Sequence, residues 1–121
     1  MYRVEYDRQA NVMRIHVEGF WNLKNVSGFA AAVGVATNHA RDAGRDDFDV
    51  IVESLDFPVQ GTEVADLLTD VMRAGMSQTN GRSAVVVGSH LNRLQAERTL
   101  VHPRVRVFLS MEEAEAWLAG G

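Results

Sequence analysis

Six residues that follow strand-like segments have side chains able to bind a ligand or contact a partner: Phe20, Trp21, Asp56, Thr62, Ser89 and His90. Ser89, His90 and Asp56 supply the groups of a serine hydrolase triad. Sequence neighbours rarely face each other, however, and the chain has no Gly-x-Ser-x-Gly elbow. The turn at 88–90 also lacks the glycine spacing and the lysine of a phosphate loop. We therefore expect no enzymatic activity and no catalytic residue.

Thr62 stands directly before an apolar helical stripe, and two interpretations of it stay open. In the first, its hydroxyl caps the helix, which contributes about 1 kcal/mol to stability. In the second, Thr62 is a phosphorylation site. A phosphate at a helix N-terminus meets free N–H groups and the positive end of the helix dipole, and it would place a double negative charge on a docking surface.

The adjacent aromatic residues Phe20 and Trp21 could form a ligand wall or a partner anchor, although one of such a pair usually points into the core. His90 could sense pH or hold an anion, or it could lie in solvent beside a helix cap. The other histidines have neither metal-ligand spacing nor an obvious carboxylate partner, so we predict no metal site and no cofactor. They are His16, His39 and His102, interpreted as surface or boundary residues.

The strands that would position these residues differ in hydrophobic pattern. Residues 2–7 and 13–17 alternate apolar and polar side chains around a polar turn, which predicts a hairpin with an edge strand. The segments at 50–52 and 84–87 are continuously apolar, as in central parallel strands. The last predicted strand, at 104–109, alternates again.

Helical stripes fill the segments between these strands. Asn22 or Asn25 can cap a first helix whose apolar line runs through Val26, Phe29, Val33, Ala36 and Ala40. A second helix follows the apolar spacing of 64–75, and a weaker third begins near Ser89 or His90. Ser110 and Glu113 have the spacing of a capping box for a fourth helix.

Together these segments predict an α/β layer fold in one domain, residues 1–121, with an antiparallel N-terminal edge strand and then parallel strands alternating with four helices. In such sheets ligands bind beyond the carboxyl ends of the strands. The loops at 19–25, 55–62, 88–90 and 109–111 are therefore the candidate binding surface.

Composition narrows the class of protein. With 121 residues and 46% hydrophobic content, the chain can bury a core unaided, and the absence of cysteine suits a reducing cytoplasm. A net charge of −4 argues against nucleic acid as a partner. No apolar run is long enough for a signal peptide or a membrane span, so we expect a soluble bacterial-type cytoplasmic protein.

Two features favour either a homodimer or an apolar pocket. Gly28 and Gly34 lie inside the first predicted helix, where each costs about 1 kcal/mol relative to alanine. Either the helix closely approaches another backbone, such as that of a second subunit, or the two glycines are merely tolerated. The strands at 50–52 and 84–87 are apolar on both faces. If the helices cover one face, then a helix, a ligand or a partner chain must cover the other.

Three segments resemble the STAS domain, and within it the SpoIIAA-like group of small stand-alone proteins related to anti-anti-sigma factors. They are EGFW at 18–21, VIVESLDF at 50–57 and VFLSMEEAEAWL at 107–118. The resemblance covers nearly the whole chain and implies a non-enzymatic regulatory module that binds another protein through strand-end loops.

The resemblance also bears on Thr62. Anti-anti-sigma factors carry an Asp-Ser-Ser-Gly-like sequence in which a serine at a helix N-terminus is phosphorylated to break partner binding. In FPVQGTEVADLL at 57–68, Gly61 and Thr62 stand where the serines would fall and the aspartate is absent, so Thr62 is the remaining hydroxyl. The same general fold occurs in CRAL-TRIO lipid-transfer domains, which implies an alternative, a carrier of a lipid-like or other apolar small molecule.

Overall fold

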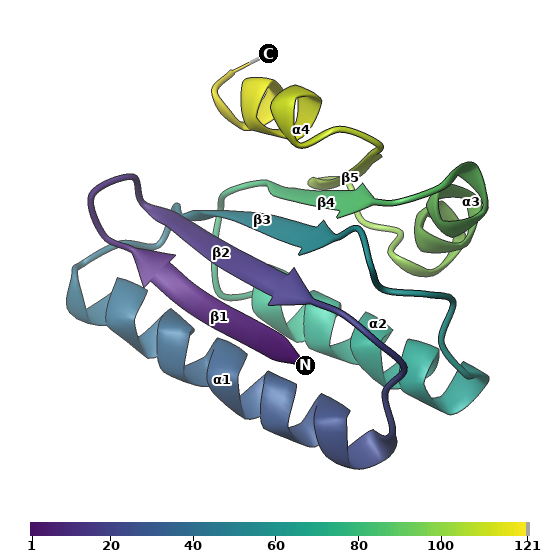
Figure 1. Ribbon diagram of the computed structural model, residues 1–121. Helices are drawn as coiled ribbons and strands as arrows, with labels where there is room; N and C mark the ends of the chain where they lie inside the picture. Colours follow the sequence, from purple (N-terminus) through teal and green to yellow (C-terminus); the bar gives the residue numbers. More distant parts are fainter. Residues whose placement is uncertain (121) are drawn as a thin grey trace.

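A single mixed sheet organises the chain, and the computed structural model describes residues 1–120 of it (Figure 1). The strands follow the order β1-β2-β3-β4-β5, with β1 antiparallel to β2 and all other neighbours parallel. They span β1 Tyr2–Asp7, β2 Val12–Val17, β3 Asp49–Ser54, β4 Ser83–Val87 and β5 Val105–Phe108. The helices span α1 Leu23–Asp42, α2 Thr62–Met76, α3 His90–Thr99 and α4 Met111–Leu118. The predicted fold class and element order are confirmed.

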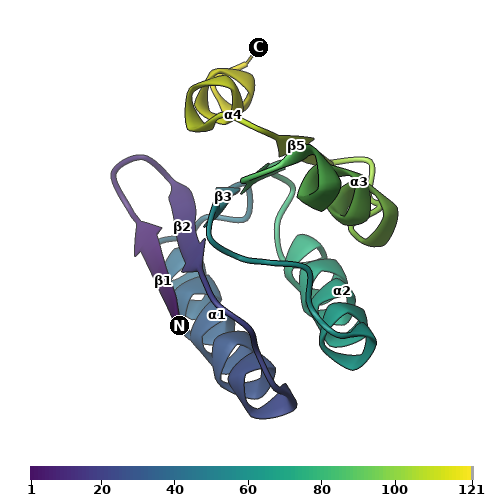
Figure 2. The same cartoon turned by 45° about the vertical axis from the view of Figure 1, so that its right-hand side comes forward.

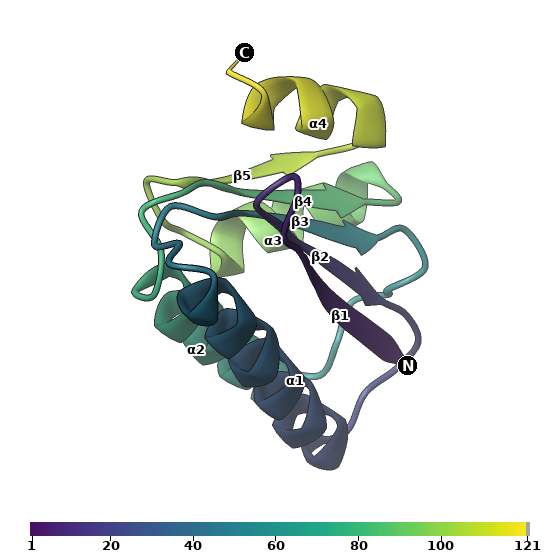
Figure 3. The same cartoon turned by 90° about the vertical axis from the view of Figure 1, so that its left-hand side faces the viewer.

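The helices divide unequally between the two faces of the sheet. Figures 2 and 3 show α1, α2 and α3 on one face and α4 alone on the other. The alternation of β2 explains where α1 packs, because Met13, Ile15 and Val17 all point into the cluster that contains Val26 and Phe29 of α1. Among the described residues, the other face of β1 and β2 is mainly polar and uncovered, except at Val12, which packs against the apolar cluster beneath α4.

The two-faced apolar strands are covered within the chain. All five residues of β4 are buried. Ala84 and Val86 pack with Ala114 and Trp117 of α4, while Val85 packs on the opposite face with α3. A second subunit is therefore not needed to cover these strands.

Polar caps fix where the helices begin. Asn22 and Asn25 form the reciprocal capping box of α1, with both side-chain-to-backbone distances at 2.9 Å. Ser89 and Ser110 cap α3 and α4. The cap predicted for Thr62 is wrong, because Gly61 has the extended N-cap conformation and Thr62 is already the first helical residue.

Polar contacts hold helix α2 at its C-terminal end and at its middle. The Arg104 guanidinium donates to the carbonyl of Met76 at the end of α2 and to the carbonyl of Thr79 just beyond it, both at 2.9 Å. Thr69, midway along α2, donates to the carbonyl of Thr99 at 3.1 Å. The α2 backbone lies close to α1 and α3 rather than to the sheet.

Gly28 is explained by the N-terminal strand rather than by a partner chain. A Cβ at Gly28 would lie 2.5 Å from the Tyr2 hydroxyl oxygen, while a Cβ at Gly34 would meet nothing within 4 Å. The Tyr2 ring is held in edge contacts with Trp21 and Phe29, at centroid distances of 5.7 and 5.8 Å. Gly28 thus has an explanation within one chain, whereas no neighbouring atom requires glycine at position 34.

Gly34→Ala is expected to raise the free energy of unfolding by about 0.5–1 kcal/mol, because alanine has a higher helix propensity than glycine and the added methyl group meets no neighbour. Gly28→Ala is expected to lower it by about 1 kcal/mol or more, since the new methyl group displaces the Tyr2 ring. Urea unfolding measures both changes.

The double variant Tyr2→Phe/Gly28→Ala supplies the control. The next nearest atom to the added Cβ, Cζ of Tyr2, is at an ordinary 3.4 Å, so removal of the hydroxyl should restore stability. A Gly28→Ala variant as stable as Gly34→Ala would contradict this explanation.

Candidate functional site

Large apolar side chains are exposed together at the carboxyl end of the parallel strands. They come from the chain start, the loops after β2 and β3, and the first turns of α1 and α3, at one end of the molecule (Figure 1). We call this surface the strand-end rim, made of Met1, Phe20, Leu23, Leu55, Val59, Leu91 and Leu94. Exposure ranges from 38% at Val59 to 76% at Phe20.

Backbone contacts tie the loops of the strand-end rim together. The N–H of Gly19 donates to the carbonyl of Asp56 at 3.1 Å, joining the loop after β2 to the loop after β3. At the loop after β4, a Cβ on Gly88 would lie 2.3 Å from the Leu55 carbonyl oxygen, so only glycine permits this approach. The three loops therefore form one connected surface.

The buried side chain of Gln60 completes this connection. Its amide nitrogen donates to the carbonyls of Gly19 and Pro58, at 3.0 and 2.7 Å, and its oxygen accepts from the N–H of Trp21 at 2.8 Å. Sequence reasoning missed Gln60, because its partners include loop residues 39 and 41 positions away. Its one local signal is a polar residue directly before a helix start.

The structure separates the two adjacent aromatic residues. Phe20 is exposed, whereas Trp21 is only 6% exposed and packs edge-to-face with Phe29 and Phe57. The Trp21 indole N–H donates to the carbonyl of Glu18 at 2.9 Å. Trp21 therefore supports the strand-end rim from inside the core, and Phe20 is the aromatic ring that the rim presents.

The other predicted site residues lie exposed at the same end of the molecule. They are Asp56, Thr62, Ser89 and His90. The Ser89 hydroxyl accepts from the N–H of Asn92 at 3.1 Å as the α3 cap. Within residues 1–120, no hydrogen bond joins the side chains of Ser89, His90 and Asp56, so they form no hydrogen-bonded triad.

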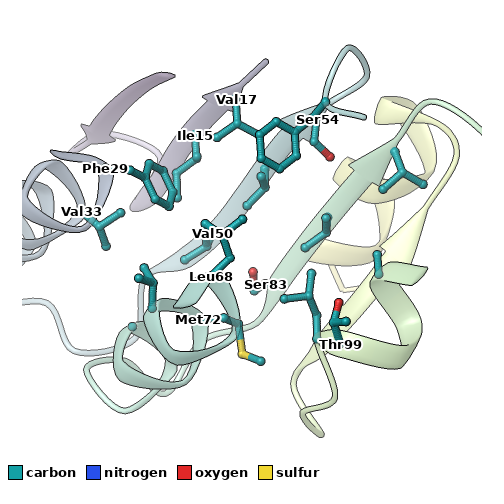
Figure 4. A pocket seen from close by; sticks show the side chains of 18 of the residues that line it. Ile15, Val17, Phe29, Val33, Val50, Ser54, Leu68, Met72, Ser83 and Thr99 are labelled. Atoms are coloured by element: carbon teal, nitrogen blue, oxygen red, sulfur yellow. The ribbon is translucent and has the colours of Figure 1, made fainter. Parts of the chain in front are cut away.

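An apolar cavity of about 200 Å³ lies between α2 and the sheet (Figure 4). Its walls include Val50, Val52, Val85, Leu68, Val71 and Met72. Val52 lies in the middle of the sheet and Leu68 on α2, yet both are only partly buried, because α2 stands away from the strands. We call this space the α2 cavity. Residues 57–60, from the loop after β3, line it as well.

His16 corrects the sequence interpretation, because it has two carboxylate partners on the uncovered face of the sheet. Its Nε2 lies 2.9 Å from Oε1 of Glu18, and its Nδ1 lies 3.2 Å from Oε1 of Glu53. The hydrogen bond with Glu18, more than the charge of Glu53, raises the pKa of His16 above its ordinary value, against an opposing effect of burial. The i, i+2 spacing of His16 and Glu18 along a strand is a signal that could have revealed the first contact.

The raised pKa of His16 makes stability depend on pH. Protonated His16 is favoured in the folded state, so its contribution is present below about pH 6.5 and lost as pH rises through the higher folded-state pKa. His16→Gln should therefore cost more stability near about pH 5.5 than near about pH 8.5. Urea unfolding at the two pH values and an NMR titration of the His16 ring measure this.

Glu18→Gln should lower the His16 pKa, while Glu97→Gln, a substitution on α3, should leave it unchanged. An equal cost of His16→Gln at both pH values would show that the two carboxylates do not influence this histidine.

Residues 1–120 contain no group of three or more His, Cys, Asp or Glu side chains that could hold a metal ion. In the same residues, none of the helices is long and apolar enough to cross a membrane.

Comparison with known proteins identifies the fold. The sequence matches no protein-family model and no curated protein. Among solved structures, the chain is similar to the crystal structure of an anti-sigma factor antagonist from Mycobacterium paratuberculosis, with a TM-score of 0.65 and 10% identity. The match covers 98% of this chain and 95% of that one. The chain therefore has the STAS-like fold of an anti-sigma factor antagonist.

Proposed function

We propose that this protein is a non-enzymatic, cytoplasmic regulatory module that binds another protein through the strand-end rim. The observation that carries the proposal is the gathering of seven large exposed apolar residues at one end of the molecule. Exposed apolar side chains that gather in one region of a surface mark interaction sites. The solved structure of the same fold is named an anti-sigma factor antagonist, a protein defined by its effect on another protein.

The partner surface should be apolar at its centre. Phe20 is the most exposed aromatic residue of the strand-end rim, and aromatic side chains supply a large share of binding energy at protein interfaces. Because Gln60 and Gly88 hold the loops together, the surface is formed before the partner arrives. Binding then requires little ordering of the loops, which lowers its entropic cost.

The partner can be captured with a photo-reactive amino acid at position 20 and then purified for binding measurements. Leu91→Asp should weaken its affinity at least about tenfold, because a charge would be buried at the interface. Val101→Asp is the matched control, since Val101 is 67% exposed and Leu91 is 68% exposed, but Val101 lies outside the strand-end rim. If both variants change the partner affinity equally, the interface does not lie on the strand-end rim.

Thr62 is the proposed control point of this interaction. It is exposed at the first position of α2, three residues after Val59 of the strand-end rim. A phosphate there would be stabilised by the helix N-terminus and would oppose apolar docking.

Thr62→Glu should therefore weaken binding of the captured partner about tenfold or more, measured by calorimetry. Ser77→Glu places the same charge at the opposite end of α2 and should leave the affinity unchanged. If Thr62→Glu binds the partner as tightly as the wild type does, Thr62 does not regulate the interaction, although the proposed interface stands.

A second candidate function, a carrier or binder of an apolar small molecule, rests on the α2 cavity. Its volume of about 200 Å³ exceeds the roughly 150 Å³ at which an engineered apolar cavity stays dry and binds benzene. An unfilled space between a helix and a sheet forfeits dispersion contacts, and a bound molecule would restore them.

Native mass spectrometry of gently purified protein, compared with its denatured mass, tests this candidate. A carrier should retain a noncovalent molecule, and Val52→Phe should release it by filling the α2 cavity. Val35→Phe, at an exposed position on α1, is the control. If the purified wild-type protein shows no extra noncovalent mass, the carrier function is contradicted and the protein-interaction function stands.

A further inference from the structure

Among residues 1–120, Ser83 is the buried residue lining the α2 cavity whose side-chain hydroxyl makes no hydrogen bond. It is 5% exposed and begins β4, with Val85 and Val87 on the same side of the strand. Within residues 1–120, its hydroxyl has no hydrogen-bond partner. No side-chain nitrogen or oxygen in these residues is both fully enclosed and unpaired, so the Ser83 hydroxyl opens onto the cavity.

The other buried hydroxyl groups of the cavity wall are already engaged. Ser54 donates to the carbonyl of Val86 at 2.6 Å, and Thr37 donates to the carbonyl of Val33 at 2.8 Å. In Figure 4 the oxygen of Ser83 lies among the apolar side chains of Val50, Leu68 and Met72. An unpaired hydroxyl in such surroundings costs free energy unless a molecule in the cavity hydrogen-bonds to it.

Charge limits what that molecule can be. None of the described residues lining the α2 cavity is Asp, Glu, Lys, Arg or His. An ionised group in the cavity would lose its hydration without gaining an opposite charge, which is strongly unfavourable. A hydroxyl, by contrast, can donate to a neutral carbonyl group or exchange a hydrogen bond with a neutral hydroxyl group.

We infer that the α2 cavity binds a neutral, largely apolar molecule that carries one hydroxyl or carbonyl group, and that this group hydrogen-bonds to Ser83. Ser83 pairs with Val50 and Val105 at the amino ends of their strands, away from the strand-end rim. The polar group of the ligand therefore lies at that end. Its apolar body extends along Val85 and Val87 toward Phe57. This inference rests on the second candidate function above.

The test uses 1-octanol as the probe and follows the amide resonances of the full chain by NMR titration. We expect 1-octanol to shift the resonances of Ser83, Val85 and Leu68. Octanoate, with the same chain length and a charged end, should bind at least about tenfold more weakly.

Ser83→Ala should weaken 1-octanol binding by about threefold to tenfold, the range set by one net hydrogen bond. Thr37→Val is the matched control, because it removes a cavity hydroxyl that is already paired within α1, and it should leave the affinity unchanged. Amide dispersion in each spectrum verifies that both variants fold.

The outcomes separate this inference from the carrier function. Equal affinities of wild type and Ser83→Ala, or tighter binding of octanoate, would overturn the inference. A retained molecule in native mass spectrometry without any 1-octanol binding would overturn it too, while the carrier function would stand. An empty protein that also ignores 1-octanol would overturn both.

Discussion

The central constraint on this structure is that β3 and β4 are apolar on both faces and must be shielded from water on both. Helix α4 provides the cover on one face, where Phe108 and Trp117 pack at a centroid distance of 5.6 Å. The guanidinium of Arg82 stacks over the Trp117 ring at 4.4 Å and donates to the Trp117 carbonyl. A short C-terminal helix of eight residues is thereby fixed to the sheet by both apolar and polar contacts.

Cover on the opposite face is less complete, and the candidate functions follow from that difference. The backbone of α1 lies close to β1, and that of α3 lies close to β4 and β5, while α2 lies between α1 and α3 and reaches the sheet through its side chains. Arg104 holds one end of α2, and the loop organised by Gln60 precedes the other. The side chains of Val64, Leu68 and Val71 reach the apolar cluster of the sheet, and the α2 cavity lies between them and the strands.

Local patterns in the sequence predicted most of the fold. The alternation of β2, the continuous apolar runs of β3 and β4 and the Asn22–Asn25 cap each depend on residues close together in the chain. The amphipathic pattern of α2 also predicted a helix correctly, although it could not show how far that helix stands from the sheet. The distance depends on Arg104 and Thr99, which belong to later segments.

The candidate site was harder to predict, because its properties depend on contacts between distant segments. Which of Phe20 and Trp21 is buried depends on Phe29 and Phe57, and the charge on His16 depends partly on Glu53 from the neighbouring strand. Thr62 was placed at the right end of α2, but the cap lies one position earlier, at Gly61. In the sequence, Ser83 is an ordinary residue at the start of a strand. Its role depends on the α2 cavity, which the hydroxyl faces and which the sequence pattern does not reveal.

The loop after β3 connects the strand-end rim with the α2 cavity. Val59 is exposed on the rim, and residues 57–60 also line the cavity. Gln60 belongs to this segment and holds the loop that carries Phe20. A molecule in the cavity would thus touch the inner side of a segment whose outer side forms part of the docking surface. If the two binding events influence each other, thermodynamic linkage requires the influence to be equal in both directions. A partner on the strand-end rim would then alter the affinity of the cavity as much as a ligand alters that of the rim.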